Sequence, residues 1–200
     1  MANKEGVDLI DDFLGSAHVF VSTVSEAVEK RLLRETLGDK LTYSQLKLLR
    51  LVGLADSQTI GDVAAFLGIS DPAASKAVDK LVREKLVRRS EAEDRRAISL
   101  SLTASGRRLL VLYEEARRQK LQAIFERVPP EELHRVAEFL DQISAHLLES
   151  GPPAEELCLQ CGIYFREKCL IRSKLSRRCL YQRQRGHLSN KSTPASGNSA

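Results

Sequence analysis

Residues 60–89 read IGDVAAFLGISDPAASKAVDKLVREKLVRR, and residues 93–106 read EDRRAISLSLTASG. In the first stretch apolar residues recur at three- and four-residue steps, which predicts two short helices with a break at Gly68. The SDP sequence at 70–72 suits the start of the second helix. In the second stretch apolar residues alternate, which predicts a strand. Helix, tight turn, helix and hairpin in this order predict a winged helix-turn-helix.

The elements around this unit follow from the same periodicities. Apolar residues at helical spacing predict a helix over about 7–34, and Thr42 with Gln45 has the spacing of a capping box for another. The expected helices then cover about 59–67, 70–84, 104–127 (capped by Thr103) and 131–149, with strands near 86–90 and 97–102, where Ile98, Leu100 and Leu102 alternate. The predicted fold class is mainly α, with a small β-hairpin wing and long flanking helices.

The helix over 70–84 has the features of a helix that reads DNA. A major groove accepts one α-helix, with the N-terminal part of that helix directed toward the bases. If Ala74, Ala77, Val78 and Leu81 face the core, small and basic residues face outward. The candidate DNA contacts on this helix are Ala73, Ser75, Lys76, Lys80 and Arg83, and those on the hairpin tip are Arg95 and Arg96. The alternative is an ordinary solvated helix, which the paired arginines at the tip make less attractive.

The sequence resembles the MarR-type transcriptional regulators. The resemblance is carried by LTYSQLKLLRLV (41–52), by residues 60–89, and by EDRRAISLSLTASG with its Asp-x-Arg and LTxxG. It implies a homodimer that binds a palindromic operator, often as a repressor released by a small ligand or by cysteine oxidation. It also implies that Arg96 is the wing arginine that enters the minor groove, that Asp94 holds the wing's geometry, and that Ser75 and Lys76 lie at recognition positions.

One residue departs from the pattern of the family. Lys85 stands where the family often has Gly, and Lys does not share the easy access of Gly to left-handed backbone. We therefore expect a different end to the helix before it, within the same fold.

Apolar side chains on the flanking helices support a dimer. A small three-helix core would not cover all of them, so we expect a second copy to do so; a larger monomeric core is the alternative. These residues are Leu109, Leu112, Tyr113, Ala116, Ile124 and Phe125 on one helix, and Leu133, Val136, Phe139, Leu140 and Ile143 on another.

The amino-acid composition limits the classes of protein to which this sequence can belong. The 200 residues are 42% hydrophobic and 29% charged, which is ordinary for a soluble domain. No apolar run approaches the roughly 20 residues that cross a bilayer, and the first residues do not resemble a signal peptide. We expect a cytoplasmic protein without membrane contact. Residues 151–200 contain nine Lys/Arg and three Glu, so this basic end contrasts with a net charge of −2 over the first 150 residues.

All four cysteines, Cys158, Cys161, Cys169 and Cys179, lie in this basic end. Four thiolates suit an iron–sulfur cluster or a tetrahedral zinc, and the spacing matches neither a zinc ribbon nor a ferredoxin. A reversible thiol switch is a second interpretation, because neighbouring positive charge favours thiolates. A phosphate-binding segment with incidental cysteines is a third.

The predicted organisation has five parts: a dimerisation helix (1–40), the DNA-binding domain (41–106), further dimerisation helices (107–150), a basic cysteine module (151–186) and a disordered tail (187–200). The predicted function is a sequence-specific transcriptional regulator, a repressor, whose operator affinity is set by the cysteine site. One alternative is a regulator that responds to a small organic or phenolic ligand, with the cysteines holding structural zinc. A redox or metal-handling protein on a helical scaffold is another, and no catalytic residues are expected.

Overall fold

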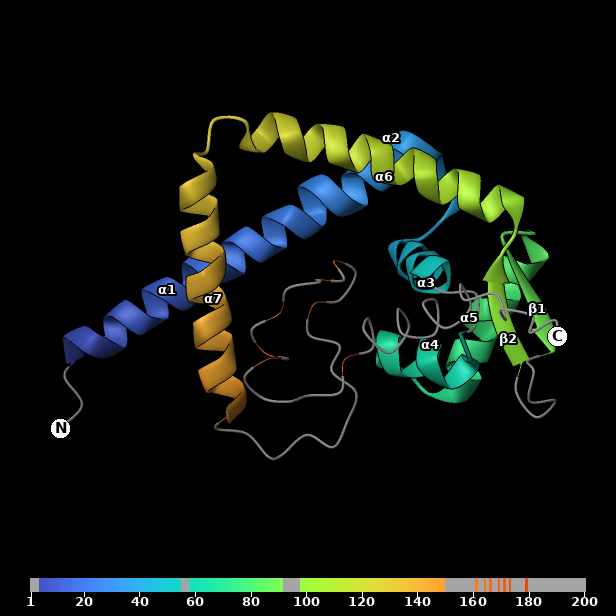
Figure 1. The fold of residues 1–200 in the computed structure, drawn as a ribbon, viewed down its shortest axis with the longest axis horizontal. Coiled ribbons are helices and arrows are strands. Elements are labelled where there is room, and N and C mark those ends of the chain that lie inside the picture. Colours follow the sequence, from blue (N-terminus) through green and yellow to red (C-terminus); the bar gives the residue numbers. More distant parts are fainter. Residues whose placement is uncertain are drawn as a thin grey trace, which may run out of the picture.

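The computed structural model describes residues 4–54, 58–91 and 98–149, and the separate positions 161, 164, 166, 169, 171, 173 and 179. In Figure 1, α6 spans the top of the molecule and α1 runs below it. Helices α3 to α5 and the hairpin lie under the right-hand part of α6. The predicted fold class is confirmed. The elements in chain order are α1 (Lys4–Thr23), the π-helical stretch η1 (Val24–Lys30), α2 (Arg31–Leu37), the short 3₁₀ turn η2 (Gly38–Lys40), α3 (Tyr43–Leu54), α4 (Ile60–Leu67), α5 (Asp71–Arg83), β1 (Val87–Glu91), β2 (Ile98–Leu102), α6 (Ala104–Phe125) and α7 (Pro130–Glu149).

The first predicted helix is one continuous helical segment made of α1, η1 and α2. Its C-terminal part is buried through Val28, Leu32, Leu33 and Leu37, which pack toward α6 and the helices below. Its N-terminal part leaves a row of large apolar side chains exposed within one chain: Leu9, Ile10, Leu14, Val19, Phe20 and Val21. One end of this segment therefore belongs to the core, and the other end is uncovered.

Helices α3, α4 and α5 enclose the core of the helix-turn-helix, with Leu46, Val63 and Leu81 fully buried. The predicted capping box at the start of α3 is confirmed, because the Thr42 N–H donates to Gln45 Oε1 at 2.8 Å and the Gln45 N–H donates to Thr42 Oγ1 at 3.3 Å. Gly68 ends α4 with a left-handed φ of 65°. This turn directs the chain into α5.

The wing is an antiparallel pair in which Val87 of β1 lies opposite Leu102 of β2. The predicted alternation is wrong for β2: Leu100 and Leu102 are buried as expected, but Ser99 and Ser101 are buried too, and Ile98 is 50% exposed. Ile98 pairs with Glu91 at one end of the ladder. The Val87–Leu102 pair lies at the other end, and α6 begins there. Core packing is therefore concentrated near α6.

The expectation of an altered helix end at Lys85 is wrong. Lys85 has a φ of 58°, so it adopts the left-handed conformation in spite of its side chain. Two hydrogen bonds close the end of α5: the Leu86 N–H donates to Leu81 O at 2.9 Å, and the Lys85 N–H donates to Val82 O at 2.9 Å. These are the two bonds of a Schellman motif, which outweigh the cost of placing a non-glycine residue there.

The LTxxG signature joins the wing to α6. Thr103 caps α6 by accepting the Gly106 N–H at 3.1 Å, and its hydroxyl donates to Lys85 O at 2.6 Å. Gly106 lies against the backbone of Leu86, where an added Cβ would come within 2.1 Å of the carbonyl oxygen. The start of β1 and the start of α6 are therefore held together closely, and only Gly fits at position 106.

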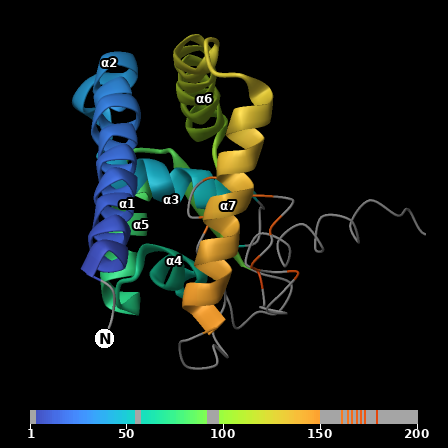
Figure 2. The ribbon, with the colours of Figure 1, turned by 90° about the vertical axis from the view of Figure 1, so that its left-hand side faces the viewer.

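Helix α7 carries the second uncovered apolar face. Ala145 is its one buried residue among those described, and Phe139 meets Phe13 of α1 edge to face, with ring centroids 6.2 Å apart. Figure 2 shows α7 standing beside the rest of the chain. Its exposed apolar residues are Leu133, Val136, Phe139, Leu140 and Leu147. Within the described residues, no helix is long and apolar enough to cross a membrane.

Replacing Lys85 with Gly should raise the free energy of unfolding by about 0.5–1 kcal/mol, because Gly relieves the left-handed backbone. The matched control is Lys80→Gly within α5, which should lower it by roughly the same amount, since Gly is a poor helix residue. Chemical denaturation at a fixed protein concentration measures both values. A loss of stability in Lys85→Gly would contradict the proposed backbone cost.

Candidate functional site

Helix α5 presents a basic stripe to solvent. Ala73, Lys76, Lys80 and Arg83 are all exposed, and their spacing of three and four residues places them on one side of the helix. The opposite side is buried in the core. The structure therefore brings these four predicted DNA-contact residues onto one surface, with the smallest of them nearest the N-terminus of α5.

Ser75 and Asp79 lie beside this stripe and face the wing. Arg89 of β1 forms an ion pair with Asp79, with Nη1 and Oδ1 2.8 Å apart, and its Nη2 donates to Ser75 Oγ at 3.5 Å. Ser75 is partly buried by this arrangement. Sequence reasoning missed Arg89. The signal was the polar pair Ser75 and Asp79, one turn apart on α5, followed by Arg88 and Arg89 in the next strand. Arg89 fixes the wing against the helix.

The hairpin tip lies outside the described residues. Asp94, Arg95 and Arg96, the predicted wing contacts, fall in this gap, so their roles stay predictions. The strand that leads into the tip is anchored, because Arg88 Nε donates to Ser101 Oγ across the ladder at 2.8 Å.

Two of the four cysteines come together. Cys161 and Cys169 line a small cavity against α7, whereas Cys179 does not line it and Cys158 lies outside the described residues. Cys161, Cys169 and Cys179 are partly buried. The described positions contain no group of three His, Cys, Asp or Glu residues that could hold a metal ion. Because one of the four predicted ligands is not described, the four-cysteine site stays a prediction.

Contacts from the cysteine segment to α7 border this cavity. Arg166 forms an ion pair with Asp141 of α7, and this hydrogen bond is the main cause of a raised Arg166 pKa. Ile171 is 8% exposed and lines the same cavity with Leu147 and Leu148. A charged contact and an apolar contact therefore fix the segment to α7.

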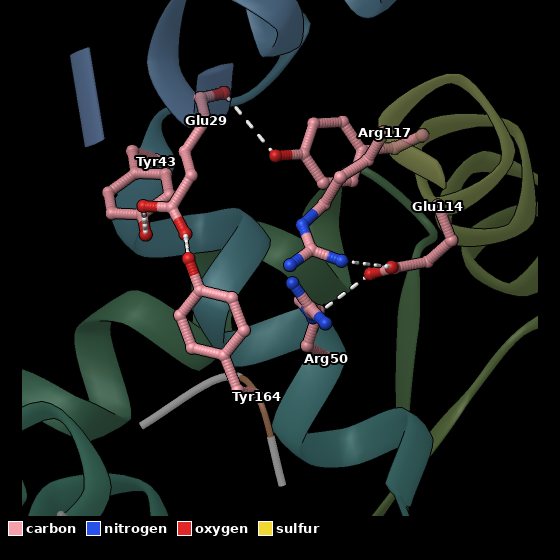
Figure 3. A network of polar contacts seen from close by, with 7 residues as sticks. Glu29, Tyr43, Arg50, Glu114, Arg117 and Tyr164 are labelled. Atoms are coloured by element: carbon pink, nitrogen blue, oxygen red, sulfur yellow. Dashed lines mark hydrogen bonds and ion pairs between the residues drawn. The ribbon is translucent and has the colours of Figure 1, made fainter. Parts of the chain in front are cut away.

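A buried carboxylate is the second place where the segment meets the fold. Glu29 in η1 is only 4% exposed, and its two oxygens accept the hydroxyl of Tyr43 and, at 2.8 Å, the hydroxyl of Tyr164. Its backbone oxygen accepts the Tyr113 hydroxyl at 3.3 Å. Figure 3 shows Tyr43 and Tyr164 converging on this side chain. Sequence reasoning missed Glu29 because charged residues surround it in the sequence, from Glu26 to Glu35; the one signal was the presence of tyrosines elsewhere, whose hydroxyls need partners when buried.

The surroundings of Glu29 keep these phenols neutral. Burial raises the pKa of Tyr43 far above its usual value, with the hydrogen bond to Glu29 as the next cause. Burial, followed by the charge of Glu29, raises the pKa of Tyr113 to about 12. The pKa of Tyr164 is also raised, first by burial and then by its bond to Glu29. Each hydroxyl is therefore a dependable donor at neutral pH.

A second polar group adjoins the first. Arg50 of α3 pairs with Glu114 of α6, with Nε and Oε1 2.9 Å apart, and burial lowers the pKa of this arginine. Arg117 reaches the other Glu114 oxygen at 3.8 Å, and its guanidinium lies 5.0 Å from the centre of the Tyr164 ring. Tyr164 is therefore held at its hydroxyl by Glu29 and over its ring by Arg117 (Figure 3).

Raised tyrosine pKa values make stability depend on alkaline pH. Above about pH 10 the unfolded chain loses phenolic protons that the folded chain keeps, so the free energy of unfolding should fall as pH rises toward the folded pKa values. At about pH 11, Tyr43 and Tyr113 should still absorb as neutral phenols in the folded protein. A phenolate absorbance titration, repeated in denaturant, measures this. Complete ionisation in the folded protein near pH 10 would contradict the network.

Comparison with known proteins shows what this arrangement resembles. Residues 39–97 match a model of the MarR family. FabT of Streptococcus pneumoniae, solved in complex with DNA, is 20% identical with a TM-score of 0.59, over 72% of this chain and 99% of FabT. RV1404 of Mycobacterium tuberculosis is 26% identical with a TM-score of 0.58, over 76% and 98% of the two chains. The MarR family transcription regulator SP03579 is 22% identical with a TM-score of 0.60, over 76% and 100%. No curated protein matches the sequence.

The resemblance read from the sequence is confirmed by both comparisons, since the family match covers the helix-turn-helix and the shared fold extends to the flanking helices. Residues 39–97 thus match the MarR family of transcription regulators, and the chain has the winged helix-turn-helix fold of these solved structures.

Proposed function

We propose that this protein binds a palindromic operator as a homodimer, with α5 in the major groove and the wing tip along the minor groove. The single observation that carries the proposal is the exposed stripe of Lys76, Lys80 and Arg83 behind the small residue Ala73 on α5. Small residues let the N-terminal end approach the bases, and the basic residues neutralise phosphates. Arg89 holds the wing at a fixed angle to this helix.

The homodimer accounts for the apolar faces of α1 and α7. These faces stay exposed within one chain although they are rich in large apolar residues, among them Phe20 of α1 and Val136 of α7. Patches of this kind mark interaction surfaces. A second copy would cover both faces and would place two recognition helices on successive turns of one side of the duplex.

The proposed signal acts through the cysteine segment. Four thiolates at Cys158, Cys161, Cys169 and Cys179 would hold an iron–sulfur cluster or Zn²⁺, and a reversible thiol switch is the alternative chemistry. The shared cavity of Cys161 and Cys169 supports a common site. The regulator would be a cytoplasmic repressor whose operator affinity changes when the site is loaded or emptied, and a binding function of this kind needs no catalytic residues.

A groove along α6 favours a second candidate signal. Leu110, Val111 and Phe125 line it together with Arg117 and Glu114, and in the described structure the buried Arg117 Nε has no hydrogen-bond partner. A largely apolar groove that also holds arginine suits a small organic acid or phenolic ligand, with the cysteines then holding structural zinc. Operator binding that depends on such a ligand and not on metal or oxidant would select this candidate.

Arg96→Ala should weaken operator binding by about 1–3 kcal/mol, because it removes the arginine assigned to the minor groove. Arg118→Ala is the matched control, since Arg118 is an exposed arginine on α6 that pairs with Glu115. Fluorescence anisotropy over a series of salt concentrations measures both the affinity and the salt dependence. Wild-type affinity for Arg96→Ala at physiological salt would remove the wing from the mechanism.

Cys161→Ser should abolish metal binding and the response of operator affinity to metal, because serine is a poor ligand for soft metals. Lys174→Ala, in the same segment, is the control that keeps all four thiols. Metal and sulfide analysis with a visible spectrum, on protein purified without oxygen, separates iron–sulfur from zinc. A Cys161→Ser protein that retains its full metal content would exclude Cys161 as an essential ligand.

A further inference from the structure

The cysteine segment is docked on the fold at two separate places. Arg166 and Ile171 hold it to α7, while Tyr164 reaches the group formed by Glu29 and Arg117. The second contact connects the segment to η1 and α6, which carry Glu29 and Arg117. The first contact lies beside two thiols, because Cys161 and Cys169 line the same cavity as Arg166 and Ile171.

We propose that Glu29, Arg117 and Tyr43 form a binding site for the side chain of Tyr164, here called the tyrosine seat. The cysteine site controls the DNA-binding domain through this contact. The control step rests on the proposed function of the cysteine site; the docking step does not. The tyrosine seat recognises a phenol by a buried acceptor for its hydroxyl and by a guanidinium over its ring.

The path from thiol to reading helix is short and continuous. The Tyr164 N–H donates to Cys161 O at 3.1 Å, so the backbones of the cysteine and the tyrosine are in direct contact. Tyr164 bonds to one Glu29 oxygen, and the other oxygen accepts the hydroxyl of Tyr43, the first residue of α3. Helix α3 packs on α4 and α5 in the helix-turn-helix. A displacement of Cys161 would therefore shift the packing of the domain that carries α5.

The position of Glu29 suits a switch. It lies in η1, where the helix widens to π geometry, and such stretches occur frequently at functional sites. A buried carboxylate that loses one of its two hydroxyl donors must find another partner or move, since an unsatisfied buried acceptor is costly. Release of Tyr164 would thus change the helix that connects the dimerisation region to α3.

Tyr164→Phe tests the proposal because it removes the hydroxyl and keeps the ring. Tyr113→Phe is the matched control, since it also removes a tyrosine hydroxyl bonded to Glu29 but touches the backbone oxygen and not the tyrosine seat. For each full-length protein, operator affinity is measured as purified without oxygen and after treatment with EDTA. Metal content and amide hydrogen exchange over residues 24–30 are measured in parallel.

We expect a wild-type affinity ratio of about tenfold between the two states, within the usual range for coupled sites. Tyr164→Phe should bring this ratio to within about twofold with unchanged metal content, and should speed exchange over residues 24–30; Tyr113→Phe should keep the wild-type ratio. A wild-type ratio and wild-type exchange in Tyr164→Phe would overturn the tyrosine seat. If the wild-type protein does not respond to EDTA, the sensing function fails, and the exchange measurement alone then decides whether Tyr164 is docked.

Discussion

The contact between three separate parts of this chain depends on one buried carboxylate. Glu29 accepts hydroxyls from α3 and from the cysteine segment, and its backbone accepts one from α6, so three parts of the chain meet on one residue. Burying an acid is unfavourable unless its oxygens are hydrogen-bonded, and here both are. Tyr43 and Tyr164 are therefore coupled through the carboxylate that they share, whereas Tyr113 bonds to the backbone oxygen.

This constraint explains how the reading surface is positioned. Helix α3 begins at Tyr43 and supports α5, while Thr103 and Gly106 hold the wing against the start of α6. The helix-turn-helix is thus joined to the long helices at both of its ends. If a second copy covers the exposed apolar faces of α1 and α7, as proposed, a change at that interface or at the tyrosine seat would reach α5 through rigid elements.

Sequence reasoning predicted the parts that depend on local physics. Periodicity and caps gave the helices, the turn at Gly68 and the hairpin, because those signals lie within a few residues of each other. It was wrong at Lys85, where the hydrogen bonds that close the end of α5 overrode backbone preference, and it missed Arg89 and Glu29. The partners of those two residues lie 10 or more positions away in sequence, as with Arg89 and Asp79, so no local pattern reveals them. The wing arginines and the complete cysteine set stay predictions.

The most direct test of the hydrogen bond between Tyr164 and Glu29 is a double-mutant cycle between Glu29→Gln and Tyr164→Phe. The free energy of unfolding is measured by chemical denaturation for the wild type, both single variants and the double variant, all at one protein concentration. If Tyr164 donates to the buried Glu29 carboxylate, the two substitutions should couple by about 1 kcal/mol, because a hydrogen bond to a charged group exceeds one to a neutral amide. Effects that add to within roughly 0.3 kcal/mol would contradict it.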